Sequence, residues 1–103
     1  MGGPMTSMEL SVIVPVYNEE RVIEVFHRAL VEVLDGLGFP CEIIYVNDGS
    51  RDQTGDRLDA LRASDSRVRL LELSRNFGHQ SALAAGLSRA SGRACVFMDA
   101  DLQ

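Results

Sequence analysis

Two aspartates one residue apart, Asp99 and Asp101, follow an apolar run near the end of the chain, and Gln103 stands two positions further on. Carboxylates that end a buried strand repel each other and lose solvation, so they need a cation or hydrogen-bond donors beside them. Carboxylate and amide oxygens are hard ligands that suit Mg²⁺ or Mn²⁺ bound together with substrate phosphates. The pattern therefore predicts a divalent-metal site formed by these three residues.

Further polar clusters follow three earlier apolar runs. Their members are Pro15, Tyr17, Asn18 and Glu19, then Asn47, Asp48, Gly49 and Ser50, then Arg75, Asn76, Gly78, His79 and Gln80. Each cluster taken alone is also compatible with a turn or a helix cap. The carboxyl ends of parallel strands, however, meet at one rim of a sheet, where open α/β folds bind their ligands. Taken together, the clusters predict one binding site.

The elements that must position these residues follow from the hydrophobic pattern. Strands are predicted at Leu10–Val16, Glu42–Val46, Val68–Leu73 and Ala94–Met98, and helices over the stripe from Val22 to Leu37, from near Ser50, and from His79 to Ala90. This alternation is typical of an α/β fold whose parallel sheet carries helices on both faces. Strand order 3-2-1-4 would keep Cys41 and Cys95 too far apart for a disulfide. Phe97 and Met98 are expected in the core, and His27 at the surface or its boundary.

Length and composition narrow the possible functions. The 103 residues suit one domain, with residues 1–8 expected to be a flexible leader or a remnant of cloning and residues 9–103 the folded unit. Fifteen acidic residues against ten arginines give a net charge of −5, which disfavours a nucleic-acid partner. The absence of lysine excludes a P-loop. No signal peptide or membrane-spanning run occurs, and two cysteines without metal spacing are typical of a cytoplasmic protein.

The ligand that fits these clusters carries a diphosphate. Residues 15–19 contain no glycine, so the first loop cannot approach a pyrophosphate as a dinucleotide-binding loop does. A metal at the acidic cluster would then hold the diphosphate. The clusters therefore favour a nucleoside-diphosphate donor whose base lies at the first two strand ends.

The same motifs resemble the family 2 glycosyltransferases. The resemblance rests on residues 14–19 (VPVYNE), residues 46–50 (VNDGS) and residues 99–101 (DAD), while residues 75–80 (RNFGHQ) and 101–103 (DLQ) are similar to the polyprenyl-phosphate, dolichol-phosphate mannosyltransferase-like branch. It implies the N-terminal, nucleotide-binding half of a GT-A (Rossmann-like) domain. The chain is accordingly expected to be a fragment of a larger protein and to be inactive alone.

The resemblance also implies roles for single residues. Pro15, Tyr17, Asn18 and Glu19 would bind the nucleotide, Asp48 would accept a hydrogen bond from the base, and Asp99 would face the ribose and the metal. Asp101 and Gln103 would coordinate Mg²⁺ or Mn²⁺, with Asp101 as the catalytic residue and the general base outside this sequence. The roles of Arg75, Asn76 and His79 stay open.

The implied reaction is inverting transfer of a hexose from a UDP- or GDP-linked sugar to a lipid-phosphate acceptor such as a polyprenyl phosphate. Membrane contact would come only through a further C-terminal part or the lipid, and the location would be cytoplasmic, including the cytoplasmic face of the membrane. A polysaccharide acceptor, a nucleotidyltransferase, and a non-catalytic nucleotide-binding or oligomer-forming half-domain are the alternatives. The sequence leaves sugar, nucleotide, lipid and oligomeric state, homo-oligomers included, open.

Overall fold

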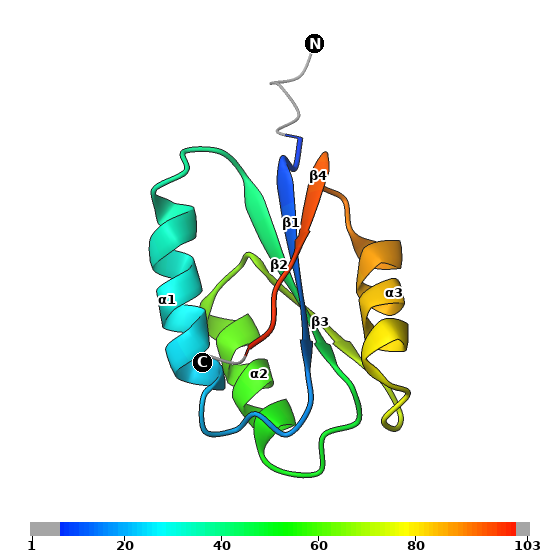
Figure 1. Cartoon of the computed structure of the whole chain (residues 1–103). Helices are drawn as coiled ribbons and strands as arrows, with labels where there is room; N and C mark the ends of the chain where they lie inside the picture. Colours follow the sequence, from blue (N-terminus) through cyan, green and yellow to red (C-terminus); the bar gives the residue numbers. More distant parts are fainter. Residues whose placement is uncertain (1–6, 101–103) are drawn as a thin grey trace.

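The computed structural model describes residues 7–100, in which strands and helices alternate (Figure 1). The elements are β1 (Leu10–Val16), α1 (Ile23–Asp35), β2 (Cys41–Asn47), α2 (Thr54–Ser64), β3 (Val68–Glu72), α3 (His79–Arg89) and β4 (Ala94–Phe97). All strand pairs are parallel, and the order across the sheet is β3-β2-β1-β4. The predicted fold class is therefore confirmed, and the strand order is the one considered above for the distance between the two cysteines. The start predicted for α2, near Ser50, is wrong, because residues 48–53 form a loop at the rim instead.

Helices cover both faces of the sheet, with α1 and α2 on one side and α3 on the other (Figure 1). Alternate residues of a strand point to opposite faces, so β1 supplies both sides of the core. Its Val12, Val14 and Val16 belong to the cluster that contains the α1 side chains, and its Ile13 belongs to the cluster on the α3 side. Burial on both faces explains why β1 and β2 are almost continuous apolar runs.

Helix α3 lies very close to the sheet at Gly86. A Cβ atom at this position would lie 2.5 Å from Ile13 Cγ2 and 3.1 Å from Val46 Cγ2. Only a residue without a side chain permits this contact, because real carbon atoms do not approach so closely. The close contact sets the height of α3 above the sheet, and with it the position of the helix start at His79.

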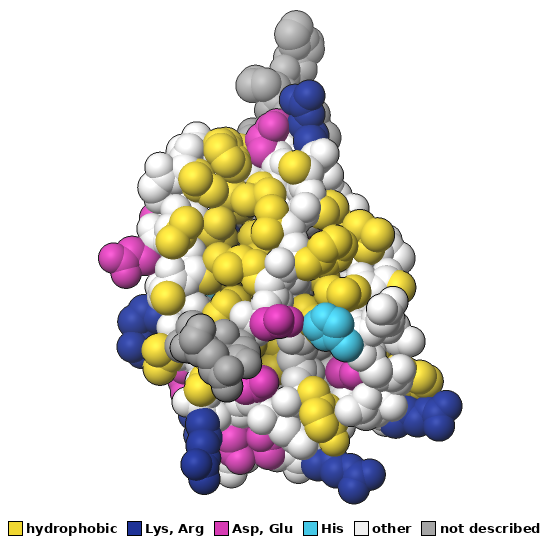
Figure 2. All heavy atoms as spheres, viewed as in Figure 1, with side chains coloured by type: hydrophobic (Ala, Val, Ile, Leu, Met, Phe, Trp, Pro, Cys, Tyr) yellow, Lys and Arg dark blue, Asp and Glu magenta, His cyan; other side chains and the backbone are white. Residues whose placement is uncertain are grey.

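The outer strand β4 is more exposed than its sequence predicts. Phe97 is 49% and Met98 36% exposed, so the expectation that both lie in the core is wrong. The reason is that β4 pairs with β1 on one side only and forms an edge of the described sheet. Beside it, an apolar groove of about 330 Å³ runs between β4 and α1 and is lined by residues such as Phe26, Val33 and Val96. Figure 2 shows apolar side chains gathered on this face.

A buried carboxylate joins three segments at the amino ends of the strands. Glu42 is 3% exposed and accepts hydrogen bonds from Ser11 Oγ at 2.6 Å, Ser91 N at 2.8 Å and Ser91 Oγ at 2.9 Å. The Gly92 amide in turn donates to Ser11 Oγ at 2.8 Å. Burial alone would raise the pKa of Glu42, but these donors outweigh it and keep the pKa below its usual value. The network ties the α3–β4 connection to β1 and β2.

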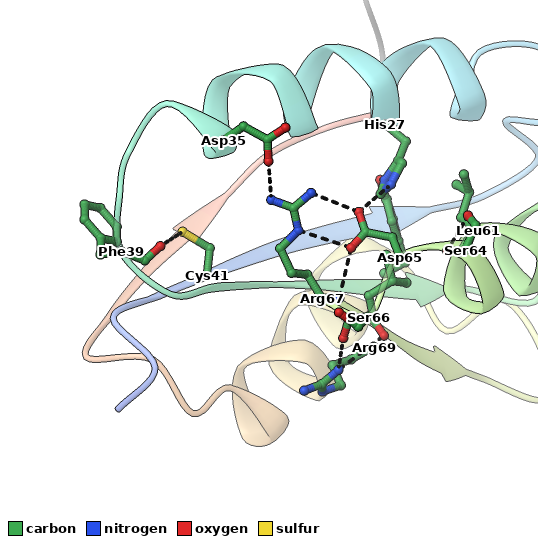
Figure 3. Close-up of polar contacts among 12 residues, drawn as sticks. His27, Asp35, Phe39, Cys41, Leu61, Ser64, Asp65, Ser66, Arg67 and Arg69 are labelled. Carbon is green, nitrogen blue, oxygen red and sulfur yellow. Dashed lines mark hydrogen bonds and ion pairs between the residues drawn. The ribbon is translucent and has the colours of Figure 1, made fainter. Parts of the chain in front are cut away.

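His27 is a buried residue, which corrects the expectation that it lies at the surface or its boundary. It is 7% exposed, with Nδ1 2.7 Å from the Tyr45 hydroxyl and Nε2 3.2 Å from Asp65 Oδ2. Arg67 binds Asp65 and also Asp35 at the end of α1 (Figure 3). Because the Asp65 carboxylate is an acceptor, Nε2 carries the proton and Nδ1 accepts from Tyr45. The cluster therefore joins α1 to β2 and to the α2–β3 connection.

This cluster should make the stability of the chain depend on pH near neutrality. Burial lowers the pKa of His27, against the opposing attraction of Asp65, so an unfolded chain binds a proton at a higher pH than the folded chain does. The free energy of unfolding should therefore fall as the pH decreases from 6.5 toward the folded-state pKa, by up to about 1.4 kcal/mol per pH unit. Urea unfolding between pH 7 and 5 measures this slope.

The His27→Gln variant should have a smaller slope over the same range, whereas His79→Gln, at an exposed position, should keep that of the parent chain. An unchanged slope in the His27 variant would show that His27 does not cause the dependence.

Candidate functional site

The polar clusters meet in one cavity at the carboxyl rim of the sheet. Its volume is about 470 Å³, and it is lined by Pro15, Val16, Tyr17, Glu19, Asp48, Asn76, Gly78, His79, Asp99 and Ala100. The lining comes from the ends of β1 and β2, the start of α3 and the segment after β4. Five predicted nucleotide-binding residues are thus placed around a single cavity that we call the rim cavity.

Asn18 is the predicted nucleotide-binding residue that does not line the rim cavity. Its φ of 52° lies in the left-handed region, which asparagine tolerates better than most residues. Its amide donates to Ser50 Oγ at 2.9 Å, and its Oδ1 accepts the Arg51 amide at 2.9 Å. These contacts tie the loop after β1 to the loop after β2, so the structure gives Asn18 a part in shaping the loops.

The loop after β1 has a second attachment to the loop after β2. The Glu19 amide donates to Thr54 Oγ1 at 2.8 Å, and Thr54, which is fully buried, is fixed by Asp52. Glu19, which lines the rim cavity, therefore stands on a backbone that is held in place. Such attachment reduces the conformational entropy that ligand binding would have to overcome.

The predicted metal ligands are only partly within the described part of the chain. Asp99 is exposed and lines the rim cavity, whereas Asp101 and Gln103 lie outside the described residues. Within residues 7–100, no group of three histidine, cysteine, aspartate or glutamate side chains is arranged to hold a metal ion. The oxygen donors of Asp99, Asp101 and Gln103 nevertheless have the chemistry that Mg²⁺ and Mn²⁺ prefer. The ligand set fits a hard divalent cation.

Asp48 has contacts that its sequence motif does not predict. It is 4% exposed, and its Oδ1 and Oδ2 accept the backbone amides of Phe77 at 2.8 Å and Gly78 at 3.1 Å. Arg75 stacks over the Phe77 ring, with its guanidinium carbon 4.7 Å from the ring centre. Asp48 is therefore bound to the loop between β3 and α3.

A second cavity, of about 460 Å³, lies on the other side of that loop. It is lined by residues that the sequence motifs do not predict as ligands, among them Arg51, Asp52, Asp56 and Glu72. Glu72 ends β3 and was assigned to a strand, and Arg51, Asp52 and Asp56 occupy a segment assigned to a helix. The signal that could have identified them is their position at or after the carboxyl ends of two neighbouring strands, β2 and β3. Tyr17 and Asn76 line both cavities.

The electrostatic character of the rim cavity suits a cation-linked ligand. Glu19, Asp48 and Asp99 contribute carboxylates, and the exposed His79 stands at the start of α3.

None of the described helices is long and apolar enough to cross a membrane. Cys41 and Cys95 are free thiols, the first buried and the second exposed.

Comparison with known proteins agrees with the resemblance. The family model described as "Glycosyl transferase family 2" matches residues 11–103. A bactoprenol glucosyl transferase of Shigella phage SfV is 45% identical over 96 residues, which cover 93% of this chain and 31% of the relative. The chain thus spans about a third of the length of the curated relatives it matches.

Two solved structures share the fold. The mannosyltransferase PcManGT from Pyrobaculum calidifontis, in complex with GDP-Man and Mn²⁺, is 28% identical with a TM-score of 0.79, over 90% of this chain and 27% of that one. TarS of S. aureus in complex with UDP-GlcNAc is 31% identical with a TM-score of 0.78, and the match covers 91% of this chain and 27% of TarS. These likenesses confirm the predicted GT-A architecture. The motifs, the fold and the matching family model together show that the chain belongs to glycosyl transferase family 2.

Proposed function

We propose that this chain forms the donor-binding half of a glycosyltransferase that uses a nucleoside-diphosphate sugar. The observation that carries the proposal is the meeting of Pro15, Tyr17, Glu19, Asp48 and Asp99 in one cavity at the carboxyl rim of a parallel sheet. Ligands of open α/β folds bind at this rim. The likeness to structures titled as complexes with GDP-Man and UDP-GlcNAc supports the same class of donor.

A divalent cation belongs to this proposal. Asp99, Asp101 and Gln103 would hold Mg²⁺ or Mn²⁺, and Mn²⁺ accompanies GDP-Man in the PcManGT complex. When bound, the ion would offset the negative charge that develops on the leaving nucleoside diphosphate. Tyr17, Pro15 and Glu19 would hold the nucleoside against the end of β1, which keeps the donor in one orientation.

The acceptor in the proposal is a polyprenyl phosphate, and the transfer inverts the anomeric centre. The support is the similarity to a protein named as a bactoprenol glucosyl transferase. A phosphate monoester is largely ionised near neutral pH, with a second pKa of about 6, so it needs little help from a general base. This site, at the cytoplasmic face of a membrane, would receive the nucleoside-diphosphate sugar from the cytoplasm and the polyprenyl phosphate from the membrane.

The direct test is a thermal melt of the 103-residue chain with UDP or GDP, each with and without MnCl₂. At a hundredfold excess over Kd, binding should stabilise the folded chain by about 2.7 kcal/mol. For a domain of this size, that corresponds to a rise in Tm of about 11–22 °C. The rise should require nucleotide and Mn²⁺ together, and the effective nucleotide identifies the base.

Mn²⁺ alone and each nucleotide alone are the controls. A cooperative melt that neither nucleotide shifts in the presence of Mn²⁺ would contradict the donor site and favour a half-domain without nucleotide binding. An equal shift with and without Mn²⁺ would contradict the metal dependence while leaving the nucleotide site supported.

A further inference from the structure

The loop of residues 75–78 between β3 and α3 forms a wall between the two cavities at the rim. Arg75 lines the second cavity, Gly78 lines the rim cavity, and Asn76 lines both. Residues 74–77 are exposed, so few buried contacts of their own side chains hold this segment. The position of the wall must therefore depend on what fixes its backbone.

The backbone of the wall is fixed chiefly by Asp48. Oδ1 of Asp48 accepts the Phe77 amide at 2.8 Å, and Oδ2 accepts the Gly78 amide at 3.1 Å. The Gly78 amide also donates to Asn76 Oδ1 at 2.9 Å, whereas Asp48 is the one acceptor of the Phe77 amide among residues 7–100. Hydrogen bonds to an ionised carboxylate are among the stronger ones in proteins. Asp48 itself is held at the end of β2, where its amide donates to Val16 O at 2.8 Å.

Gly49 allows the wall to approach β2. Its φ of 74° lies in the region that favours glycine, and an added Cβ would lie 2.5 Å from Asn76 N and 2.7 Å from Arg75 Cα. The obstructing atoms are backbone, which cannot move aside as a flexible side chain can. Asp48 and Gly49 therefore act together: the glycine leaves room for the loop, and the carboxylate binds it there.

We propose that Asp48 and Gly49 are positioning residues that fix the 75–78 loop, and through it set the shape of the nucleotide site. For its link to donor binding, this inference rests on the proposed function. Each Asp48 oxygen already accepts a loop amide, and the residue is 4% exposed. The groups that the loop presents to the rim cavity are Asn76, Gly78 and the adjoining His79. Through these residues the attachment at Asp48 shapes the site, in addition to the contact with the base that is expected of Asp48, and it gives Asn76 and His79 a role that the sequence left open.

Amide hydrogen exchange by NMR on the 103-residue chain tests the attachment without any activity. Asp48→Asn keeps the shape of the side chain but replaces one acceptor oxygen with an NH₂ group. This group cannot accept a hydrogen bond from the Phe77 or Gly78 amide that it faces. Exchange at Phe77 should accelerate about tenfold or more, the equivalent of losing one charge-assisted hydrogen bond. Gly49→Ala should accelerate the same amide, because it displaces the loop sterically. Asp59→Asn, which changes the charge equally on the exposed surface of α2, should leave Phe77 unchanged.

Nucleotide affinity supplies the second readout, with UDP and GDP in the presence of Mn²⁺ as probes. Both loop variants should weaken nucleotide binding. The double variant should bind nucleotide about as well as the single variant with the lower affinity, because the two changes release the same loop. The amides of Ile13 and Ile44, in the buried sheet, report whether each variant is folded. If Asp48→Asn unfolds the chain, Gly49→Ala carries the test.

Two results would overturn the inference. Unchanged exchange at Phe77 in folded variants would show that Asp48 and Gly49 do not fix the loop. Faster exchange with full nucleotide affinity would show that the loop does not shape the site. Failure of the parent chain to bind either nucleotide contradicts the proposed donor site instead, and the exchange measurement still decides whether the loop is attached as described.

Discussion

The Glu42→Ala variant is expected to lose about 3 kcal/mol or more of its free energy of unfolding. The change leaves Ser11 Oγ, Ser91 N and Ser91 Oγ without their shared acceptor in a place where Glu42 is 3% exposed. Ser11 is fully buried, and a buried donor without a partner is costly, whereas Ser91 is exposed and loses only its charge-assisted bonds. A domain of this length has only about 5–15 kcal/mol of stability in total. Urea unfolding followed by circular dichroism measures the loss, and the midpoint should fall with little change in slope.

Glu32→Ala on the exposed surface of α1 is the matched control, and it should change stability by less than about 0.5 kcal/mol. The parent chain should also lose stability in acid, because the Glu42 pKa lies below its usual 4.5 in the folded state. That contribution is complete above pH 4.5 and is lost as the pH falls through the folded-state pKa. Equal stability of the Glu42 and Glu32 variants would refute the structural role assigned to this carboxylate.

The Asp101→Asn variant should lose the Mn²⁺-dependent part of nucleotide binding. An amide is a weaker ligand for a hard cation than a carboxylate, and the change removes a full negative charge from the proposed metal site. At a concentration that stabilises the parent chain by about 2.7 kcal/mol, the variant should gain almost nothing from nucleotide and Mn²⁺. The stability without ligand should stay the same, which separates loss of binding from loss of folding.

In the longer transferase that the proposal implies, the same substitution should reduce sugar transfer by about 10²–10³-fold, the usual effect of removing one group that stabilises transition-state charge. Asp59→Asn, on the exposed surface of α2, should retain both binding and transfer. Nucleotide and Mn²⁺ that stabilise the Asp101 variant as strongly as the parent would rule out Asp101 as a metal ligand.

The fold was predictable because the two central strands are buried on both faces. Ile13 and Ile44 face α3 while Val14 and Tyr45 face the other helices, so β1 and β2 read as continuous apolar runs. Edge strands carry a weaker signal, because the sequence of β4 does not reveal that one of its sides has no neighbour. Phe97 therefore looked like a core residue and is half-exposed.

The hydrophobic pattern could not predict contacts between residues that are distant in the sequence. His27 stands near the edge of the apolar stripe of α1, and its burial depends on Tyr45 and Asp65, which lie 18 and 38 positions away. The rim cavity was predictable because parallel strands end on one side of a sheet. The attachment of Asp48 to Phe77, across 29 positions, depends on loop conformation, which no local motif specifies.

The central place of β1 has a consequence for the order in which the chain can assemble. β1 is made before the other described strands, yet its partners are β2, some thirty residues later, and β4, where Leu10 pairs with Ala94. Contacts between such distant segments form late, because a long loop must first be closed. Since synthesis proceeds from the N-terminus, β1, β2 and β3 can associate with α1 and α2 while β4 is still being made. β4, the last of the described strands, brings Asp99 to the rim, so the proposed nucleotide site is complete only after β4 has joined the sheet.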